Sequence, residues 1–230
     1  MSNTFPSYSL PKLKIIGTEE QITIHNIYCI GRNYKAHAAE MGFSVDKSAM
    51  NPFYFLKSNL FLKQSGATIP YPAQTQNLHH EVELVVVIAK DGSNIEPSQA
   101  QEYIYGYCIG LDMTRRDLQA ELRDKSLPWD LAKNFANAAI VSSITPQAVC
   151  GEISQGEIKL SVNGEIRQKS NLSQMIWTVA EIITDLSRYY PLAAGDLIFT
   201  GTPEGVSAVK SGDYLCGEIA NLGKLELYIE

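Results

Sequence analysis

The segment His80-Glu81-Val82-Glu83-Leu84-Val85-Val86-Val87-Ile88 decides the fold of this chain. Its last five residues are all aliphatic, which predicts a strand buried on both faces. Residues two apart in a strand project to the same side, so Glu81 and Glu83 are expected to share one face at the mouth of this strand. Neighbouring carboxylates are costly unless a cation, a shared proton or water compensates them. A divalent metal is one solution, and two glutamates hydrated at a solvent-exposed strand end are the alternative.

The whole chain has an ordinary globular composition. Its 230 residues are 45% apolar and 19% charged, enough for one sizeable domain or a core with an N-terminal appendage. The formal net charge of −6 argues against nucleic acid or an anionic membrane as a main partner. The first twenty residues contain no apolar run long enough for a signal peptide or a membrane span. The four cysteines lie far apart without zinc spacing, and we expect a reducing, cytoplasmic location in which Cys29 and Cys108 are buried.

The remaining segments indicate an α+β fold with mixed sheets. Strands outnumber helices, and hairpins alternate with crossovers, which does not fit a doubly wound nucleotide fold. Asn163-Gly164 is a strong hairpin signal. We expect a helix over 33–41, a second opened by a Thr114-x-x-Asp117 capping box and running to 122, and a third over 175–186 with Ser173 as N-cap. Other strands are expected at 22–24, 27–30, 53–56, 104–111, 158–162, 197–200 and 225–229.

Asp112 supplies a third acid. It ends the strand predicted over 104–111, which could lie beside the strand that carries Glu83. Three carboxylates from neighbouring strand ends would form an oxygen-rich site for Mg²⁺ or Mn²⁺, with positions open for substrate and water. Zinc would recruit His or Cys, and His79 and His80 keep that alternative open. Adjacent residues in a strand face opposite ways, however, so each histidine is more readily a structural partner than a ligand.

His37 and Glu40 form a second candidate group. They lie three residues apart in the first predicted helix and would be neighbours on one face. A carboxylate beside an imidazole raises its pKa and orients its ring, which gives a base able to take a proton from water. The alternative is a surface pair that stabilises the helix by no more than about 0.5 kcal/mol. Without other evidence, that simpler interpretation is preferred.

Basic residues follow the acids along the chain. Arg116 could form a bidentate pair with a substrate carboxylate, and Arg115 competes for that role. Lys133 lies in an apolar stretch and could hold a carboxylate or stabilise an oxyanion, or it could extend to the surface. The Gly-Thr-Pro-Glu-Gly turn at 201–205 could meet a small anion, which alone is weak evidence. No Gly-x-Ser-x-Gly or Gly-x-Gly-x-x-Gly motif supports α/β-hydrolase or dinucleotide chemistry.

These hints belong to six blocks whose order is informative. The blocks are Gly31-Arg32-Asn33-Tyr34 with His37 and Glu40, Phe55 to Ser58, His80 to Leu84, Gly110 to Gln119, Leu127 to Phe135, and Gly195 to Val206. In this order they resemble the fumarylacetoacetate hydrolase superfamily, from about Ile27 to the C-terminus. The Asp-Met-Thr, Leu-Pro-Trp and His-x-x-Glu elements are most similar to its short acylpyruvase and oxaloacetate decarboxylase-like branch. The resemblance implies a mixed β-sandwich roll with few helices, an N-terminal extended segment at 1–25, a single catalytic domain at 26–230, and a homodimer.

The resemblance also implies roles for individual residues. The Glu-x-Glu and Asp positions, here Glu81, Glu83 and Asp112, bind Mg²⁺ or Mn²⁺ in such proteins. The lid His and Glu, here His37 and Glu40, activate water. The positions that hold the α-keto carboxylate end of the substrate and complete the site are Arg32, Arg116, Gln119 and Thr202, together with Lys133 as a catalytic residue. The segment 134–138 departs from many relatives and puts substrate size in doubt more than chemistry.

The implied reaction is hydrolysis of a C–C bond in acylpyruvates, such as acetylpyruvate or fumarylpyruvate, to pyruvate and a carboxylic acid. A metal chelated by the C1 carboxylate and C2 carbonyl oxygens would stabilise the enolate that leaves. Oxaloacetate decarboxylation or keto–enol tautomerisation is the alternative, because each needs the same enolate without water attack. A non-catalytic metal-binding dimer is disfavoured, since the acids and the lid pair are intact. The polar loop over 43–51 is expected to be mobile and to let the lid close.

Overall fold

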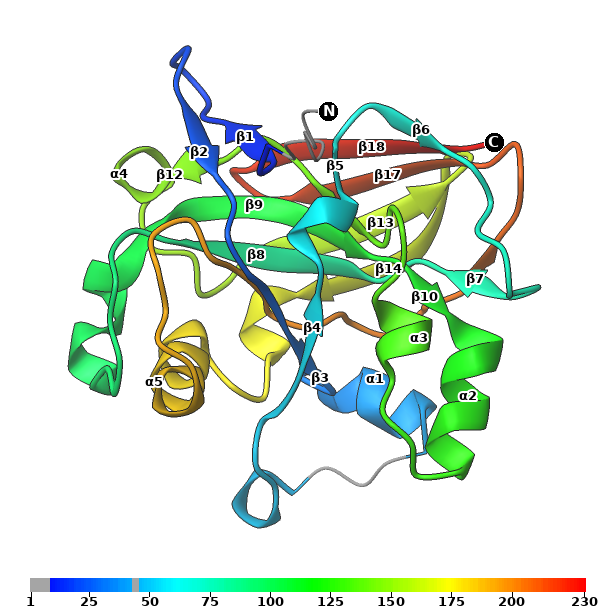
Figure 1. Cartoon of the computed structure of the whole chain (residues 1–230), viewed down its shortest axis with the longest axis horizontal. Helices are drawn as coiled ribbons and strands as arrows, with labels where there is room; N and C mark the ends of the chain where they lie inside the picture. Colours follow the sequence, from blue (N-terminus) through cyan, green and yellow to red (C-terminus); the bar gives the residue numbers. More distant parts are fainter. Residues whose placement is uncertain (1–8, 43–45) are drawn as a thin grey trace, which may run out of the picture.

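The computed structural model describes residues 9–42 and 46–230, which form an α+β molecule with two packed mixed sheets. β8 and β9 cross the middle of the larger sheet (Figure 1), whose strand order is β4-β3-β15-β8-β9-β11-β5, with β12 paired to β9. Its pairings are both parallel and antiparallel, so the predicted mixed-sheet α+β class is confirmed. The strands are β3 (Ile27–Gly31), β4 (Phe53–Lys57), β5 (Leu62–Gln64), β8 (Val82–Ile88), β9 (Ile104–Asp112), β11 (Ala139–Val141), β12 (Thr145–Pro146) and β15 (Leu197–Phe199).

The second sheet packs against β8 and β9 in the order β14-β13-β17-β18-β6. Gly217 allows this close approach, because a Cβ there would lie 3.2 Å from Cγ2 of Val82. The predicted hairpin is present: Asn163 and Gly164 have φ values of 52° and 85°, as a two-residue turn between antiparallel strands requires. The strands are β6 (Ala67–Ile69), β13 (Glu157–Val162), β14 (Glu165–Asn171), β17 (Tyr214–Ile219) and β18 (Gly223–Ile229). Two small sheets join β1 (Lys12–Lys14) to β2 (Gln21–Thr23), and β7 (Leu78–His79) to β10 (Thr114–Arg115) and β16 (Ala208–Val209).

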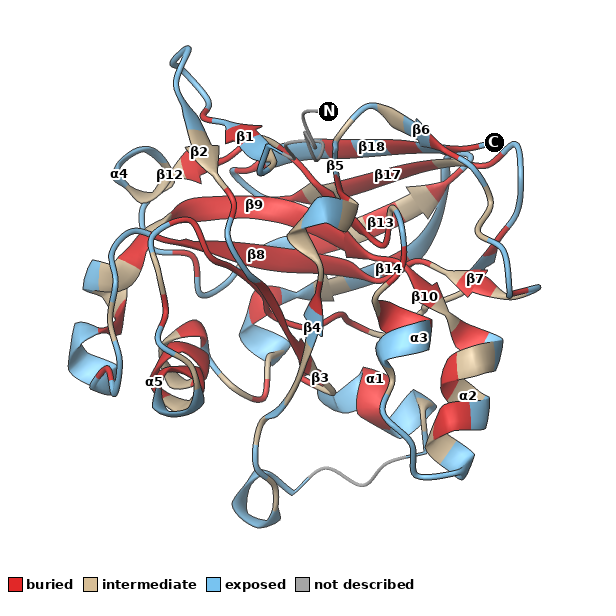
Figure 2. Ribbon diagram, viewed as in Figure 1, coloured by how far each residue is buried: buried red, intermediate tan, exposed pale blue. Residues whose placement is uncertain are grey.

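The core lies on both sides of β8, as its sequence predicts. Leu84 and Val86 belong to the apolar cluster between the two sheets, whereas Val85 and Val87 belong to a second cluster on the opposite face. β8 is buried along its whole length, and β9 is buried except at the half-buried Tyr105 (Figure 2). Burial of each such side chain stabilises the fold by roughly 1.5–3 kcal/mol, which fixes the strand and therefore the acids at its start. Cys29 and Cys108 are buried in the second cluster, as expected.

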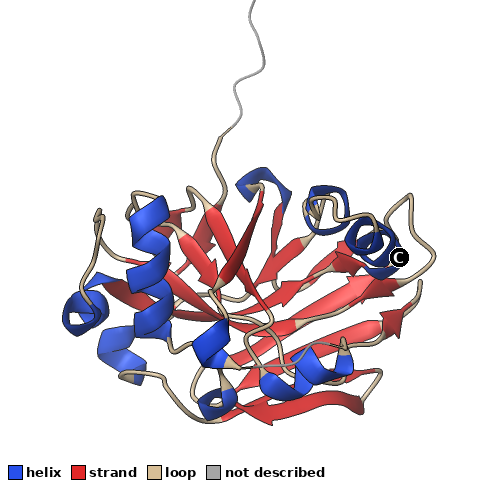
Figure 3. Cartoon of the chain, turned by 90° about the horizontal axis from the view of Figure 1, so that it is seen from below, coloured by secondary structure: helices blue, strands red, loops and turns tan. Residues whose placement is uncertain are grey.

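Helices surround the margins of the sheets (Figure 3), and α1, α2 and α3 gather at one end of β8 and β9 (Figure 1). No helix among the described residues is long and apolar enough to cross a membrane. The α-helices are α1 (Lys35–Glu40), α2 (Arg116–Asp124), α3 (Asp130–Lys133), α4 (Gln147–Cys150) and α5 (Val179–Tyr189), and the 3₁₀ helices are η1 (Lys47–Ala49), η2 (Asn59–Phe61), η3 (Pro97–Tyr103) and η4 (Leu172–Gln174).

The two predicted helix caps are both wrong. Thr114 lies in β10 and makes no cap, and α2 begins at Arg116, because the Asp117 carboxylate accepts hydrogen bonds from Thr75 and Gln76 instead. Ser173 lies in η4, and the capping box of α5 is formed by Thr178 and Glu181. At Thr114 a tertiary contact overrides the local pattern, whereas at Ser173 a different local capping box, Thr178-x-x-Glu181, sets the start of the helix.

Candidate active site

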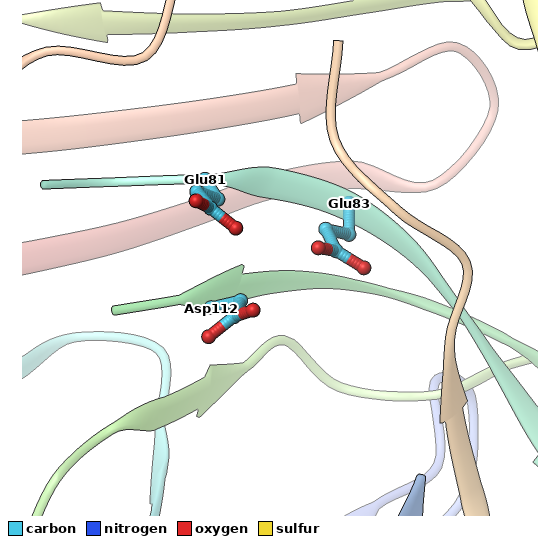
Figure 4. Close-up of side chains that lie close together, drawn as sticks. All are labelled: Glu81, Glu83 and Asp112. Atoms are coloured by element: carbon cyan, nitrogen blue, oxygen red, sulfur yellow. The ribbon is translucent and has the colours of Figure 1, made fainter. Parts of the chain in front are cut away.

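Glu81, Glu83 and Asp112 converge at the ends of β8 and β9 (Figure 4). One carboxylate oxygen from each lies within 4.8 Å of the others, and all three residues are buried. The antiparallel register produces this arrangement: Glu83 lies opposite Gly110, and the Asp112 N–H donates to the Glu81 carbonyl at 2.9 Å. The fold therefore brings together the three acids that the sequence predicts as a group.

Three cations contact two of these acids. Lys133 Nζ lies 2.7 Å from Glu81 Oε2 and 2.6 Å from Asp112 Oδ2. Lys57 Nζ lies 2.7 Å from Asp112 Oδ1, and the Arg116 guanidinium pairs with Glu81. Lys133 is buried, so its side chain does not extend to the surface. Lys57, which the sequence analysis missed as a site residue, neutralises the acids together with Lys133 and Arg116.

Glu83 differs from the other two acids in its partners. Its carboxylate accepts a hydrogen bond from the Gly201 N–H at 2.6 Å, and it forms no ion pair with a cation among the described residues. Burial and the charges of Asp112 and Glu81 raise the pKa of Glu83 well above its usual range. At Glu81, burial acts in the same direction, but Lys133 and Arg116 outweigh it and hold the pKa below its usual range. A divalent cation would favour the ionised form of Glu83.

The donor set fits Mg²⁺ or Mn²⁺ better than zinc. It consists of carboxylate oxygens, the ligands that hard divalent cations prefer. The two histidines nearby have other partners: His80 contacts Gln168 at 2.8 Å and Ser207 at 3.0 Å, and His79 contacts Asn77 at 3.0 Å. Burial lowers the pKa of both histidines to about 4, so they are neutral near pH 7. The structure places them as hydrogen-bonding partners outside the acidic group.

The lid pair lies beside the acids. His37 Nδ1 lies 3.2 Å from Glu40 Oε2 on α1, and the ring is near enough to Glu81 that a positive charge on it would lower the pKa of that acid. The Glu40 carboxylate also accepts from the Gly205 N–H at 3.3–3.4 Å, which closes α1 onto the turn over 201–205. The His37 residue is only 7% exposed, whereas the Glu40 side chain is 39% exposed, so the imidazole is buried and its carboxylate partner faces solvent.

Asn33, which sequence reasoning missed as a structural anchor, holds the start of the lid. Its side-chain amide donates to the carbonyls of Thr200 at 2.8 Å and Trp177 at 3.0 Å, and accepts from the Trp177 N–H at 2.7 Å. The predicted mobile loop over 43–51 falls partly on residues 43–45, outside the described residues. In its described part, Lys47 pairs with Glu181 at 2.7 Å, which ties the chain after the lid to α5.

The other predicted site residues divide into two groups. Arg116 contacts Gln119 as well as Glu81, so both point toward the acids. Arg115 instead donates to the Leu131 carbonyl at 3.0 Å, which places Arg116 rather than its neighbour at the site. Thr202 donates to the Val82 carbonyl at 2.9 Å and positions the turn. Arg32 lies at the outer edge, with its guanidinium 5.7 Å from the ring centres of Phe53 and Trp129.

Tyr34 is a further residue that the sequence analysis quoted without a role. Its hydroxyl is buried and has no hydrogen-bond partner within 9–42 and 46–230. Burial and the charges of Glu83 and Glu204 raise the pKa of this phenol, so it remains a neutral donor. The sequence alone marks an aromatic residue as a core candidate, and only the fold shows that the Tyr34 hydroxyl is buried without a partner among the described residues.

Comparison with known proteins agrees with this geometry. Residues 26–230 match the family described as fumarylacetoacetate (FAA) hydrolase C-terminal. A fumarylpyruvate hydrolase from Ralstonia sp is 51% identical over 190 residues, 82% of this chain and 98% of that one. A mitochondrial oxaloacetate tautomerase from Rattus norvegicus is 40% identical over 205 residues, 89% and 91% of the two chains. The crystal structure of fumarylpyruvate hydrolase from Pseudomonas aeruginosa in complex with Mn²⁺ and pyruvate is similar with a TM-score of 0.94, at 42% identity and covering 99% of each chain. The fold type and the family are thereby confirmed, and this chain belongs to the fumarylacetoacetate hydrolase family.

Proposed function

We propose that this protein is a Mg²⁺- or Mn²⁺-dependent hydrolase that cleaves acylpyruvates to pyruvate and a carboxylic acid. The observation that carries the proposal is the buried group of three carboxylates beside a closed His–Glu pair. The named activity of the Ralstonia relative and the Mn²⁺ and pyruvate in the Pseudomonas structure support it.

The acids and their cations define where the α-keto acid end binds. Glu81, Glu83 and Asp112 would hold the ion, which when bound supplies positive charge to the C1 carboxylate and C2 carbonyl oxygens of the substrate. Lys133 Nζ donates to Glu81, Asp112 and Thr114, which fixes its positive charge next to the same position. Arg116 and Gln119 present a further guanidinium and amide toward it. These groups favour an enolate oxygen over a neutral carbonyl, because they are fixed in place before charge develops.

His37 is placed to act as the general base. With Nδ1–H donated to Glu40, the basic nitrogen of His37 is Nε2. In this proposal His37 takes a proton from water, and the water oxygen adds to the C4 carbonyl. The C3–C4 bond then breaks, its electron pair leaves as pyruvate enolate, and protonation at C3 completes pyruvate while C4 becomes the carboxylic acid. The Gly205 N–H holds Glu40, and therefore the ring, in the closed position.

Oxaloacetate tautomerisation or decarboxylation is the second candidate. The Rattus norvegicus relative named as an oxaloacetate tautomerase favours it. Both reactions pass through the same enolate and use the acids and Lys133, but neither requires water attack. The His37–Glu40 pair, at 3.2 Å, offers a base for water in hydrolysis and equally for the C3 proton in tautomerisation, so it does not by itself separate the two candidates.

Product analysis separates these functions. The purified protein is given acetylpyruvate, fumarylpyruvate and oxaloacetate with Mg²⁺, with Mn²⁺ and with a chelator, and the products are identified by NMR. Pyruvate plus acetate or fumarate, formed only with metal, is the expected result. Pyruvate and CO₂ from oxaloacetate alone, or enol–keto exchange alone, would favour the second candidate. Undiminished hydrolysis with the chelator would contradict the metal site.

Assembly and location are further proposals. The family resemblance supports a homodimer. The dispersed cysteines, which form no disulfide with one another, support a reducing, cytoplasmic location. The protein's partner is a small α-keto acid; with a net charge of −6, neither nucleic acid nor membrane is expected. Light scattering on the purified protein tests the dimer, and a mass equal to one chain would contradict it.

A further inference from the structure

A cavity of about 390 Å³ lies between β4, Arg32 and the segment that joins α2 to α3. Four aromatic residues line it: Phe53, Tyr54, Phe55 and Trp129. Two arginines, Arg32 and Arg123, also face it, and Asp130 is its acidic residue. The lining therefore combines flat apolar surfaces with one net positive charge.

This cavity adjoins the acidic site on two sides. The ring centre of Phe55 lies 5.0 Å from Lys133 Nζ, which contacts Glu81 and Asp112. On the other side, Arg123 and Trp129 also line a smaller void of about 20 Å³ that Arg116 and Gln119 share.

Helix α2 accounts for this continuity. Residues 116, 119 and 123 recur at three- and four-residue spacing and lie on one helix face. That face runs from the acids outward: Arg116 pairs with Glu81, and Arg123, one helical turn beyond Gln119, reaches the larger cavity.

The two guanidiniums are close enough to affect one another. Burial, and then the charge of Arg123, lowers the pKa of Arg32. Arg123 contacts the carboxylate of Asp124 at 3.3 Å, but the Asp124 side chain is 70% exposed, so solvent screens this pair. A carboxylate between two guanidiniums would relieve their repulsion and accept charge-assisted hydrogen bonds.

We propose that this cavity binds a second, distal carboxylate of the substrate, so that the preferred acylpyruvates are those whose acyl group ends in a carboxylate. The inference rests on the proposed function, which places the α-keto acid end at the acids. The acyl chain then passes Phe55 and Trp129, whose flat faces suit an unsaturated carbon chain, and its end meets Arg123 and Arg32. Fumarylpyruvate has this chemistry, whereas acetylpyruvate ends in a methyl group.

Arg123→Gln tests the proposal through substrate preference. With Mn²⁺, its kcat/KM for fumarylpyruvate should fall by about 10- to 100-fold, mainly through KM, because one charge-assisted contact to the carboxylate is lost. The ratio of kcat/KM for fumarylpyruvate to that for acetylpyruvate should fall by the same factor. Arg123→Lys should recover part of the ratio. Lys125→Gln, which removes a positive charge at the end of the same helix from an exposed residue outside the cavity lining, is the matched control and should leave the ratio unchanged.

A binding measurement makes the test independent of turnover. Trp129 lines the cavity, so titration of the Mn²⁺-loaded protein with fumarate should change its tryptophan fluorescence, and crotonate, with one carboxylate fewer, should bind at least about 10-fold more weakly. Equal fumarate affinity in the wild type and Arg123→Gln, or equal loss of both substrates, would overturn the proposal. Absence of turnover on either substrate, with fumarate binding that still depends on Arg123, would instead contradict the proposed function and leave the cavity assignment standing.

Discussion

At the scale of single residues, substitution of His37 should lower the rate of hydrolysis without lowering the affinity for the metal. The His37 ring contacts Glu40 and lies near Glu81, but it is not one of the three oxygen donors. His37→Ala should therefore lower kcat for hydrolysis by about 100- to 10,000-fold, the usual contribution of a positioned base. Mn²⁺ affinity, measured by calorimetry, should stay within about twofold of the wild-type value. Parallel loss of activity and metal affinity would mean that His37 has a structural role.

Glu83 should show opposite effects on metal binding and on the stability of the metal-free protein. Glu83→Gln removes the acid that has no ion-pair partner among the described residues, so Mn²⁺ affinity should fall by more than about 100-fold. Without metal, the same change removes repulsion with Asp112 and Glu81, so Tm measured in chelator should be equal or higher.

An exposed acid supplies the control for Glu83. Glu165 lies on β14 with its side chain 73% exposed. Glu165→Gln should therefore change neither the Mn²⁺ affinity nor the Tm of the metal-free protein. A lower Tm for metal-free Glu83→Gln would contradict the unfavourable charge assigned to Glu83.

The sequence predicts residues whose chemistry is visible in their type and spacing, and misses those defined by the fold. Glu81 and Glu83 were found because a strand places them on one face. Lys57 follows three apolar residues of β4, and nothing in that pattern shows that Asp112, 55 positions later, comes within 2.7 Å. Tyr34 was missed for the same reason, since burial of its hydroxyl is a tertiary property.

At the scale of elements, the turn after β15 depends on a glycine. Gly201 has φ +93°, and a Cβ there would lie 2.6 Å from Cβ of Asn33, the anchor of α1. Gly201→Ala should lower the free energy of unfolding by about 1–2 kcal/mol from backbone strain and by a further 1–3 kcal/mol from overpacking. It should also weaken Mn²⁺ binding, because the Gly201 N–H that holds Glu83 is displaced.

Gly17→Ala isolates the backbone contribution. Gly17 has φ +84°, and a Cβ there would meet nothing within 4 Å. Urea denaturation of both variants should show the larger loss in Gly201→Ala, with Mn²⁺ affinity unchanged in Gly17→Ala. Equal losses of unfolding free energy in the two variants would show that Asn33 accommodates the added methyl group without destabilising the fold.

Element types were predictable here, and helix starts were not. β8 is a run of aliphatic residues, and the hairpin at Asn163-Gly164 has its own turn chemistry, so both follow from local sequence. Thr114 has the form of a capping residue, yet its hydroxyl accepts from Lys133 Nζ at 2.7 Å within the site. The Trp177 N–H donates to Asn33, and α5 begins after it at Val179, behind the capping box of Thr178 and Glu181. A long-range contact displaced the local preference at Thr114, and a competing local cap displaced it at Ser173.

At the scale of the whole molecule, the site is assembled from distant parts of the chain. Glu81, Asp112 and Lys133 meet because β8 pairs with β9 and α3 packs beside β10. Local pattern predicts that each acid ends a strand, but the strand order β15-β8-β9-β11 is set by packing of the complete sheets. The mixed-sheet class and a candidate metal site at neighbouring strand ends could therefore be predicted from the residues alone, whereas the choice of the metal over hydrated glutamates came from the family resemblance.

Buried histidine should make global stability depend on pH. His80 is fully buried, and burial lowers its pKa from 6.5 to about 4. Between these values the unfolded chain binds a proton that the folded chain does not, so stability falls as pH decreases from 6.5 to 4 and is unaffected by this group above 6.5. The full difference amounts to about 3 kcal/mol at most.

His80→Asn should remove that part of the acid sensitivity. Asparagine retains a donor toward Gln168 but does not titrate, so the loss of unfolding free energy between pH 6.5 and pH 4 should be smaller than in the wild type. His25→Asn is the control, because His25 is exposed and should leave the pH dependence almost unchanged. Chemical denaturation at several pH values in chelator measures this without metal release. Glu81 and other acids are ionised in the folded protein, so both variants should still lose stability below pH 4. If the unfolding free energies of the wild type and of His80→Asn fell equally between pH 6.5 and pH 4, His80 would be protonated without unfolding.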